Sequence, residues 1–414
     1  MFITTQPKES KTYLYRIMAT WTKQSLFELG EVNRGKSKHR PRNDAVLYGG
    51  KYPFIQTSDI KHSNFYITKH EQTYNEEGLK QSKLWPKGTL CITIAANIAE
   101  SGILSYPACF PDSVVGFVAN QKKSNTKFVK YALDFAKQNF QKTAKGTAQD
   151  NLSLEKIKSI KIDAPEVSEQ NKIADVISAY DSLIENNNRR IKILEEMAQR
   201  LYTEWFVKFN LPAEVLTKAG FPDGKLKMID SGTKYSIIPE GWAITKLGNK
   251  IKIRKGKNIT KGTITHGVVP VIAGGLNAAY CHNKVNTKWP VVTISASGAN
   301  AGFVNLHYED VWASDCSYID SNVTRNVYFH YLYLKNKNKE IKNLQRGAAQ
   351  PHVYPKDLMT LSIIDYPEAL IDNFQREVNK LFVLIGNVKN KNRVLTKIRD
   401  LLILQIITGK RALK

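Results

Sequence analysis

The sequence predicts an α+β protein with two mixed α/β globular parts in tandem. Each part is followed by a long helix, and the two helices pair as an antiparallel coiled coil with pseudo-two-fold symmetry. Three observations lead to this prediction. Short segments recur about 200 residues apart. Short β-branched runs bounded by Gly, Pro or Asn come before each helix, and each helix carries a long apolar pattern of three-then-four spacing.

Composition bounds the class of protein. The chain has 414 residues, of which 42% are hydrophobic, and this is enough apolar surface for two or three cores. It carries 61 Lys and Arg against 37 Asp and Glu, a formal net charge of +24, and nucleic acid fits this charge better than an anionic membrane does. The longest apolar run, Leu401 to Ile407, is far shorter than the roughly 20 residues of a membrane helix. The N-terminus lacks the apolar core of a signal peptide, so we expect a cytoplasmic protein.

The internal repeat fixes the order of the parts. Leu29-Gly30 aligns loosely with Leu247-Gly248, and the better matches are Thr93-Ile94 with Thr293-Ile294, Gly146 with Gly347, Pro165-Glu166 with Pro367-Glu368, and Leu194 with Leu395. We therefore predict six segments: an N-terminal extension (1–19), a first globular part (20–165), a first long helix (166–208), a connector rich in Pro, Gly and turn residues (209–240), a second globular part (241–367) and a second long helix (368–414).

The globular parts are expected to be rich in strands. The runs that indicate strands are YPFIQT, TLCITIA and VVGFVA in the first part and VPVIAG and PVVTISA in the second.

The two helices are expected to pair along apolar seams. The seam residues of the first helix are Ile177, Tyr180, Ile184, Asn187, Ile191, Leu194, Ala198, Leu201 and Trp205. Those of the second are Val378, Leu381, Ile385, Val388, Asn392, Leu395, Leu402 and Ile406. One Asn in each seam is expected to fix the register against an Asn or a backbone partner. Arg399 breaks the second pattern and indicates that the seam frays or meets another surface there. The alternative is that each helix packs only on its own globular part.

Such helices can space two reading parts. A helix of about 37 residues spans roughly 55 Å. Major-groove sites on one face of a duplex lie roughly 34 Å, or a multiple of that, apart.

The sequence holds few signs of catalysis or of a metal site. It has no Gly-x-x-x-x-Gly-Lys loop, no Gly-x-Gly-x-x-Gly turn, no Asn/Asp-Pro-Pro-aromatic loop and no nuclease-like carboxylate cluster. The cysteines are scattered and are expected to be reduced and buried: Cys91, Cys109, Cys281 and Cys316. Cys281 beside His282 is the only adjacent pair that could begin a metal site, and two neighbouring residues rarely face one ion, so we predict no metal.

Basic clusters recur at matching places and are the candidate DNA contacts. The first follows Leu29-Gly30 and contains Arg34, Lys36, Lys38, Arg40 and Arg42. The second begins at Lys250 and contains Lys252, Arg254, Lys255, Lys257 and Lys261, with Ile251 and Ile253 interleaved as the buried face of a strand that leads to Gly256. Such cations can reach phosphates and, through Arg, guanine edges. The alternative is ordinary solubilising charge.

Polar loop residues are candidates for base contacts, because Asn and Gln can pair with adenine. They are Gln56, Ser58, Asn277 and the two Gln of the repeated Gly-x-Ala-Gln segment, Gln149 and Gln350. A purely structural turn is the alternative for each.

The order of these segments resembles the specificity subunit of type I restriction-modification systems. The match covers almost the whole chain after about Thr20. It rests on the repeated segments GTAQDNLSLEKIKSIKI and GAAQPHVYPKDLMTLSI and on the junction from EWFVKF to IPEGW. The second helix departs from the family pattern, because Ile371-Asp372-Asn373-Phe374-Gln375 replaces the Glu-Gln pair that precedes the first helix pattern at Glu169-Gln170.

The resemblance implies two target recognition domains that each read one half of a split DNA site. The paired helices would space these domains and dock methylation subunits, of which we expect two, and motor-nuclease restriction subunits would join through these. S-adenosylmethionine, ATP and magnesium would then belong to the partners, with no cofactor in this chain.

We therefore predict a non-catalytic, sequence-specific DNA-binding subunit that directs methyltransferase and restriction subunits to a bipartite target. The alternatives are the specificity subunit of a related system that cuts on both sides of its site, a coiled-coil adaptor, and an enzyme with an unfamiliar site.

Overall fold

The structure is a computed structural model that describes residues 21–94, 100–143, 154–233, 237–347 and 350–409. Its contacts divide the chain into two compact units. Unit 1 comprises Met1–Asn186 and Asn392–Lys414, and unit 2 comprises Asn187–Lys391. Each unit thus combines one globular part with a portion of both long helices.

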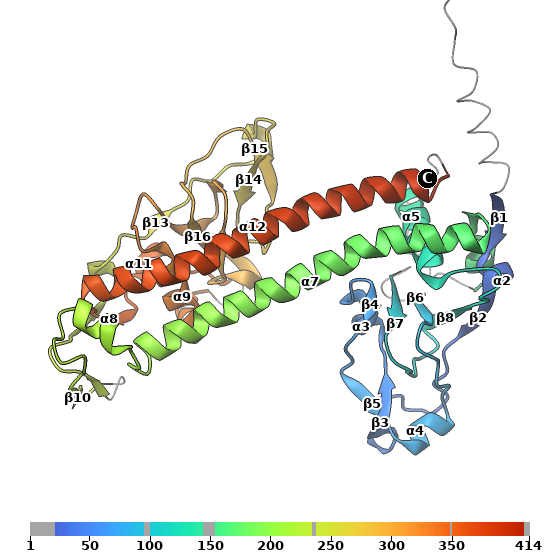
Figure 1. The fold of residues 1–414 in the computed structure, drawn as a ribbon, viewed down its shortest axis with the longest axis horizontal. Coiled ribbons are helices and arrows are strands. Elements are labelled where there is room, and N and C mark those ends of the chain that lie inside the picture. The colour runs from blue at the N-terminus through green and yellow to red at the C-terminus, as the bar shows by residue number, and fades with distance from the viewer. Residues whose placement is uncertain (1–20, 95–99, 144–153, 234–236, 348–349, 410–414) are drawn as a thin grey trace, which may run out of the picture. The chain divides into compact units, whose positions relative to one another are not determined.

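The globular part of unit 1 is built on a mixed sheet. The order of its five strands is β2 (Gly30–Arg34), β8 (Val114–Ala119), β6 (Leu90–Thr93), β7 (Ser101–Leu104) and β4 (Tyr66–Ile67), and only β4 and β7 run parallel. Two small sheets join β1 (Thr22–Ser25) to β9 (Lys161–Ala164) and β3 (Tyr48–Phe54) to β5 (Gln72–Tyr74). The helices are α2 (Leu26–Leu29), α3 (Thr57–Lys61), α4 (Glu76–Lys80), α5 (Thr126–Thr143) and α6 (Leu154–Ser159). β3, β5 and α4 form the end of this unit remote from α7 (Figure 1).

The core of unit 1 lies where this sheet meets α5 and the long helices. Leu90, Phe117 and Phe128 are fully buried there. Ile177 of the first long helix and Ile406 of the second belong to the same cluster. The helices are therefore part of the core of this unit and not an appendage to it.

Unit 2 repeats the same plan. The four-stranded sheet has the order β13 (Arg254–Lys255), β19 (Cys316–Asp320), β16 (Val291–Ser295) and β17 (Val304–His307). A three-stranded sheet contains β15 (Tyr280–His282), β14 (Val269–Ile272) and β18 (Trp312–Ala313), and β12 (Ile244–Lys246) pairs with β20 (Ser362–Ile364). The short helices are α9 (Val327–Asn336), α10 (Asn338–Asn343) and α11 (Pro355–Leu358). The runs that the sequence marked as strands contribute to β3, β6, β8, β14 and β16, but only the first half of YPFIQT belongs to β3, because α3 begins at Thr57.

The strand pairing corrects one sequence alignment. Thr93 on β6 pairs with Val114, whose carbonyl accepts from the amide of Gly35. In unit 2 the residue in the same position is Ser295, which pairs with Cys316. Thr93 therefore corresponds to Ser295 and not to Thr293. The alignment of the two repeats was therefore wrong by two residues at this strand. The sequence pattern did not reveal this error, because side chains two residues apart on a strand face the same side.

The two long helices are α7 (Val167–Phe206) and α12 (Glu368–Ile406), drawn green and red in Figure 1. In unit 1 Asp181 of α7 lies against Arg399 of α12, and in unit 2 Glu195 of α7 lies against Lys389 of α12. Residue numbers rise along one helix while they fall along the other, so the helices pair antiparallel, as predicted. No described helix is both long and apolar enough to cross a membrane.

The segment predicted as a connector contains ordered elements. They are α8 (Ala213–Lys218), β10 (Met228–Asp230) and β11 (Ile237–Pro239), the two strands pairing antiparallel. Leu216 is buried, and Phe209 and Phe221 pack on the core of unit 2. Phe221 and Phe209 both contact the ring of Trp242, at centroid distances of 6.2 and 5.9 Å.

Candidate nucleic-acid interface

The first basic segment follows β2 at the edge of the large sheet in unit 1, and its backbone is tied to the neighbouring chain. Gly35 donates its amide to the Val114 carbonyl at 2.9 Å, and Lys36 donates to the Phe110 carbonyl at 3.1 Å. The Ser82 hydroxyl donates to the Lys36 carbonyl at 2.8 Å. The segment is thus held in place before it meets any ligand.

All five predicted cations of this segment are exposed: Arg34, Lys36, Lys38, Arg40 and Arg42. Two of them have partners within unit 1. Arg40 donates to the carbonyls of Ser37 and His39 at 2.7 and 2.8 Å, and Arg42 pairs with Asp112 at 2.8 Å. Among the described residues, Arg34, Lys36 and Lys38 form no ion pair.

Two acidic residues lie beside this segment in space. Asp112 precedes β8, the strand next to β2 and distant in sequence, so its pairing with Arg42 was invisible in the local sequence. Asp44 accepts a 2.9 Å hydrogen bond from His39, which together with the amide of Val46 lowers the pKa of the Asp44 carboxyl. Both acids offset the positive charge at the Arg40 to Arg42 end of the segment.

The second basic segment occupies the same edge in unit 2. Ile251 and Ile253 are buried at 8% and 4% exposure, while Lys252 and Arg254 are exposed. This alternation gives the one buried and one basic face that the sequence predicted. β13 then pairs Arg254 and Lys255 with β19.

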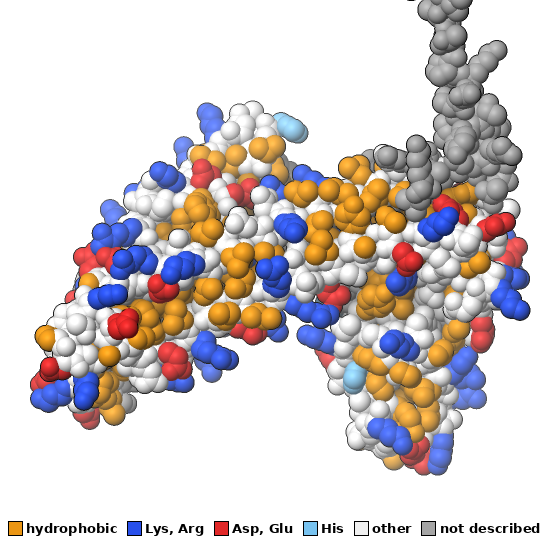
Figure 2. Space-filling model, viewed as in Figure 1, with side chains coloured by type: hydrophobic (Ala, Val, Ile, Leu, Met, Phe, Trp, Pro, Cys, Tyr) orange, Lys and Arg blue, Asp and Glu red, His pale blue; other side chains and the backbone are white. Residues whose placement is uncertain are grey.

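One cation of the second segment is ion-paired, and four others have no such partner among the described residues. Lys250 pairs with Asp365. Within the described part of the chain no ion pair involves Lys252, Arg254, Lys255 or Lys257. The side chain of Lys261 lies outside the described residues. On the face shown in Figure 2, Lys and Arg side chains are spread over both units, so charge alone does not locate the interface.

The polar candidates for base contacts lie at separate places. In unit 1 Gln56 precedes α3 and donates to Gln72, and Ser58 is exposed on α3. In unit 2 Asn277 is exposed between β14 and β15, and Gln350 is exposed beside Pro351. Gln149 lies outside the described residues.

The Gly-x-Ala-Gln segment of unit 2 is anchored at both ends. Gly347 has a φ of 91°, which favours glycine, and Gly298 donates its amide to the Pro351 carbonyl at 3.0 Å. Arg346 pairs with the buried Asp357 at 2.7 Å, a contact that the sequence did not predict although Asp357 lies in the repeated segment that follows Arg346. These bonds support the structural role of the turn and leave Gln350 exposed.

The predicted helix-pairing residues line the contact surfaces to different degrees. Ile177, Asn187, Ile191, Val378, Ile385 and Val388 are buried, and Tyr180, Ile184, Leu194, Leu201, Leu381, Asn392, Leu395 and Leu402 are half-buried. In unit 2 Ile191, Val378, Ile385 and Val388 join the main core cluster. In unit 1 Asn392 donates a long 3.5 Å hydrogen bond to the Ile184 carbonyl, the kind of backbone partner that was expected for an Asn in the seam.

Of the two expectations at Arg399, fraying is wrong, and the other, that the seam meets another surface, fits the structure. Helix α12 continues to Ile406, and Arg399 forms an ion pair with Asp181. Tyr131 of α5 also donates to Asp181. The break in the apolar pattern marks a polar contact of three elements.

The start of each long helix shows what the departure at Ile371 means. In unit 1 Gln170 is fully buried, accepts from the Asn125 amide at 3.0 Å, and donates to the carbonyls of Lys123 and Pro165 at 3.0 and 2.8 Å. In unit 2 the corresponding residue is Ile371. This Gln therefore holds the start of α7 against the loop before α5, and its loss in unit 2 changes an internal contact.

The cysteines differ from the sequence expectation at one position. Cys91, Cys109 and Cys316 are buried, and burial raises the pKa of Cys109 to about 11 and that of Cys316 to about 12. The expectation is wrong for Cys281, which is exposed because it faces out from the edge strand β15 while His282 packs on Trp312. No three His, Cys, Asp or Glu of the described residues are placed to hold a metal ion.

Comparison with known proteins decides the family. Residues 18–196 and 239–369 match the model described as the type I restriction modification DNA specificity domain. The chain belongs to this family. The family is that of type I specificity subunits, whose domain serves DNA sequence recognition, and the resemblance seen in the sequence is confirmed.

Individual relatives are similar over nearly their full length. The type I restriction enzyme MjaIX specificity subunit of Methanocaldococcus jannaschii is 24% identical over 425 residues, covering 97% of this chain and 95% of that protein. A putative type I specificity subunit of Mycoplasma pneumoniae is 23% identical over 398 residues, covering 92% and 94%. The crystal structure of the S subunit of a type I system from M. genitalium has the same fold, with a TM-score of 0.59 at 17% identity over 93% of this chain and 96% of that one.

Proposed function

We propose that this specificity subunit reads a bipartite DNA target, with the globular part of each unit reading one half. The observation that carries the proposal is the repetition of one strand plan in both units, each within a range that matches the DNA specificity domain. Two like parts with different loops suit two different short sequences, and the base pairs between the two halves of the target would be unread.

In this proposal the work is divided among kinds of residue. Cations of the two basic segments hold phosphates and so set the position on the duplex, whereas loop side chains read base edges. Gln56, Asn277 and Gln350 are supported as readers because they are exposed amides on loops or at a helix start. The chain would act in the cytoplasm on duplex DNA.

We also propose that the chain is not itself catalytic. Two methylation subunits would dock on the long helices, and restriction subunits would join through them. S-adenosylmethionine, ATP and magnesium would be bound by those partners. The purified chain, incubated with DNA, magnesium and S-adenosylmethionine, should then give neither cleavage nor methylation, and turnover by the chain alone would contradict this part of the proposal.

Sequencing of methylated bases tests the proposed target. A host that expresses this chain with its methylation partner should carry a new methylated motif made of two short specified elements and an unspecified spacer of constant length. A single continuous motif, or no new motif in a host where the methylation partner is active, would contradict the proposal.

A further inference from the structure

We propose that Arg34 with Lys36 in unit 1, and Lys255 with Lys257 in unit 2, form two equivalent contacts to the sugar-phosphate backbone of duplex DNA. The inference rests on the proposed DNA-binding function and narrows the two basic segments to four side chains.

The two sites match position by position. Val32 and Ile253 are buried at 6% and 4% exposure. In unit 1 Asn33 and Arg34 are exposed, Gly35 is buried and Lys36 is exposed. In unit 2 Arg254 and Lys255 are exposed, Gly256 is half-buried and Lys257 is exposed. The sequences Val-Asn-Arg-Gly-Lys and Ile-Arg-Lys-Gly-Lys therefore adopt one arrangement at the end of an edge strand.

The backbone of each site is held by a hydrogen bond from its glycine to the neighbouring strand. Gly35 donates to the carbonyl of Val114 at 2.9 Å, and Gly256 donates to that of Cys316 at 2.8 Å. Val114 and Cys316 occupy the same position of the corresponding strands β8 and β19. The amide of Lys36 donates to the carbonyl of Phe110, in the segment before β8, and the amide of Lys257 donates to that of Ala313, in the segment before β19.

The Cβ positions of Gly35 and Gly256 face the interior of their units. A Cβ added to Gly35 would overlap the carbonyl oxygens of Phe110 and Pro111, and one added to Gly256 would overlap that of Ser314. The side-chain position of each glycine thus points into the protein. The cations on either side of each glycine are exposed, so both side chains are open to solvent.

The four cations of the proposed contacts differ from neighbouring cations in their ion pairing. Arg42 and Lys250 are paired with Asp112 and Asp365. The four cations of the proposed contacts form no ion pair with the described residues. Their charge is therefore available for an anionic partner.

The choice of phosphate over bases follows from the repetition itself. Residues that read bases must differ between two parts that read different sequences, whereas phosphates are the same at both halves of a target. A pair of exposed cations around a glycine that makes the same backbone bond in both units fits the ligand that both share. Lys, present in each, acts as a point charge and not as a fork for base edges.

The salt dependence of binding by the full chain to a mixed-sequence duplex tests the inference. The variants are R34Q/K36Q, K255Q/K257Q and the quadruple substitution. Removing two phosphate contacts should lower the slope of log K against log salt concentration by about 1.8 for each double variant and by about 3.6 for the quadruple. The conservative pair K36R/K257R should keep the wild-type slope.

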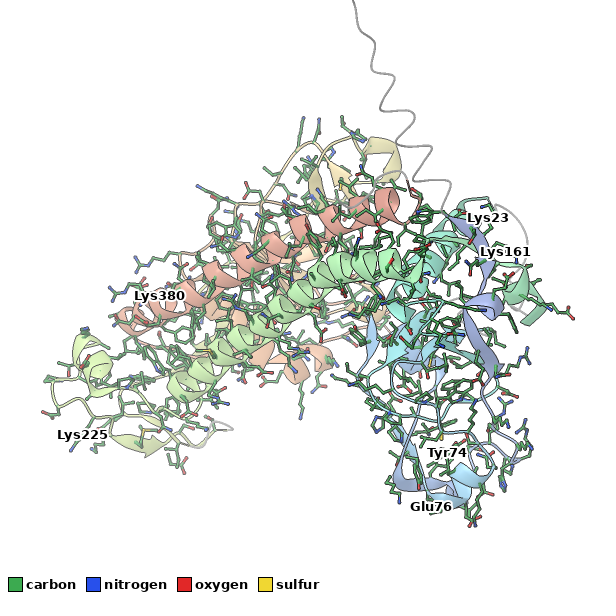
Figure 3. The ribbon with its side chains drawn as sticks, turned by 45° about the vertical axis from the view of Figure 1, so that its right-hand side comes forward. Lys23, Tyr74, Glu76, Lys161, Lys225 and Lys380 are labelled. Atoms are coloured by element: carbon green, nitrogen blue, oxygen red, sulfur yellow. The ribbon has the colours of Figure 1, made fainter. Side chains whose placement is uncertain are left out.

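Control variants remove the same number of charges elsewhere, from exposed lysines of which Lys23, Lys161 and Lys380 are ion-paired within their own unit. K23Q/K161Q changes exposed residues of β1 and β9 in unit 1, and K225Q/K380Q changes exposed residues of unit 2 (Figure 3). These controls should leave the slope unchanged. Wild-type slopes in the test variants, equal losses in the controls, or variants that lose only the binding of a methylation subunit would each overturn the inference. A wild-type chain without salt-dependent duplex binding would instead overturn the proposed function.

Discussion

Arg399 of α12 donates a 2.6 Å hydrogen bond to Asp181 of α7 within unit 1. The Asp181 carboxylate also accepts from the hydroxyl of Tyr131 on α5. Burial, followed by the negative charge of Asp181, raises the pKa of Tyr131, so this hydroxyl stays a donor at neutral pH. The contact thus joins both long helices to the globular part of unit 1.

Asp181→Asn should destabilise unit 1, because Arg399 is only 25% exposed and would lose the more buried of its two carboxylate partners, keeping only Asp400. We expect a loss of about 2 kcal/mol in the free energy of unfolding. Urea unfolding, monitored by hydrogen exchange of the α5 amides, measures this loss of free energy. The double substitution Asp181→Asn with Arg399→Met should recover part of the loss, and an additive double variant would show that the pair is not coupled.

Gln170→Leu should be costly, whereas Ile371→Gln in the corresponding place should be nearly neutral. The first leaves the half-buried Asn125 amide and two carbonyls without their partner, at a cost of about 3 kcal/mol. The second alters a half-buried side chain, and there Gln375 already accepts from the Phe329 amide at 3.2 Å. Thermal unfolding of the two variants makes the comparison, and equal losses would argue against the role assigned to Gln170.

Gly256→Ala should weaken the end of β13, because the new methyl group meets the carbonyls of Ser314 and Ala313. The backbone must shift, which strains the bond from Gly256 to Cys316, and we expect a loss of about 1 to 3 kcal/mol. Gly262→Ala is the matched control, since nothing lies within 4 Å of its added Cβ. Urea unfolding of both proteins gives the difference, and similar values would contradict the close approach at Gly256.

His307 should make unit 2 less stable in weak acid. Burial, and after it the charge of Lys389, lowers the pKa of His307 from 6.5 to about 4, and its Nε2 lies 2.8 Å from the Thr293 hydroxyl. Between these pKa values the unfolded chain binds a proton that the folded chain does not, so stability falls as pH drops from about 6.5 toward 4.

The expected contribution of His307 at pH 5 is about 2 kcal/mol relative to pH 7.5. Hydrogen exchange of the β16 amides at the two pH values measures it, with His307→Gln as the comparison. The loss between the two pH values should be smaller in the variant by this amount. The same loss in both proteins would show that His307 does not titrate in this way.

The long helices were predictable because apolar spacing over many turns is a strong signal. Helix α7 ends at Phe206, close to the predicted limit of 208, whereas α12 ends at Ile406, before the predicted limit of 414. What the pattern could not show is that Ile177 and Ile406 also belong to the core of unit 1, and Ile191 to that of unit 2. Burial in a shared core depends on contacts distant in sequence, and a helical period does not name the partner.

The basic segments were predictable as exposed charge but not as a contact surface. Asp112 and Asp365 neutralise Arg42 and Lys250 from far along the chain, and only the fold brings them together. The equivalence of Gly35 with Gly256 was missed in the same way. Loop lengths differ between the repeats, so the correct register appears only in the backbone hydrogen bonds.

The central claim is that the two units read the halves of the target independently. Replacing residues 20–165 by the corresponding part of a specificity subunit of known target, followed by sequencing of methylated bases, tests it most directly. We predict that one half of the motif changes to that of the donor while the other half and the spacer length stay as they were. A change in both halves, or an unchanged motif, would contradict the account.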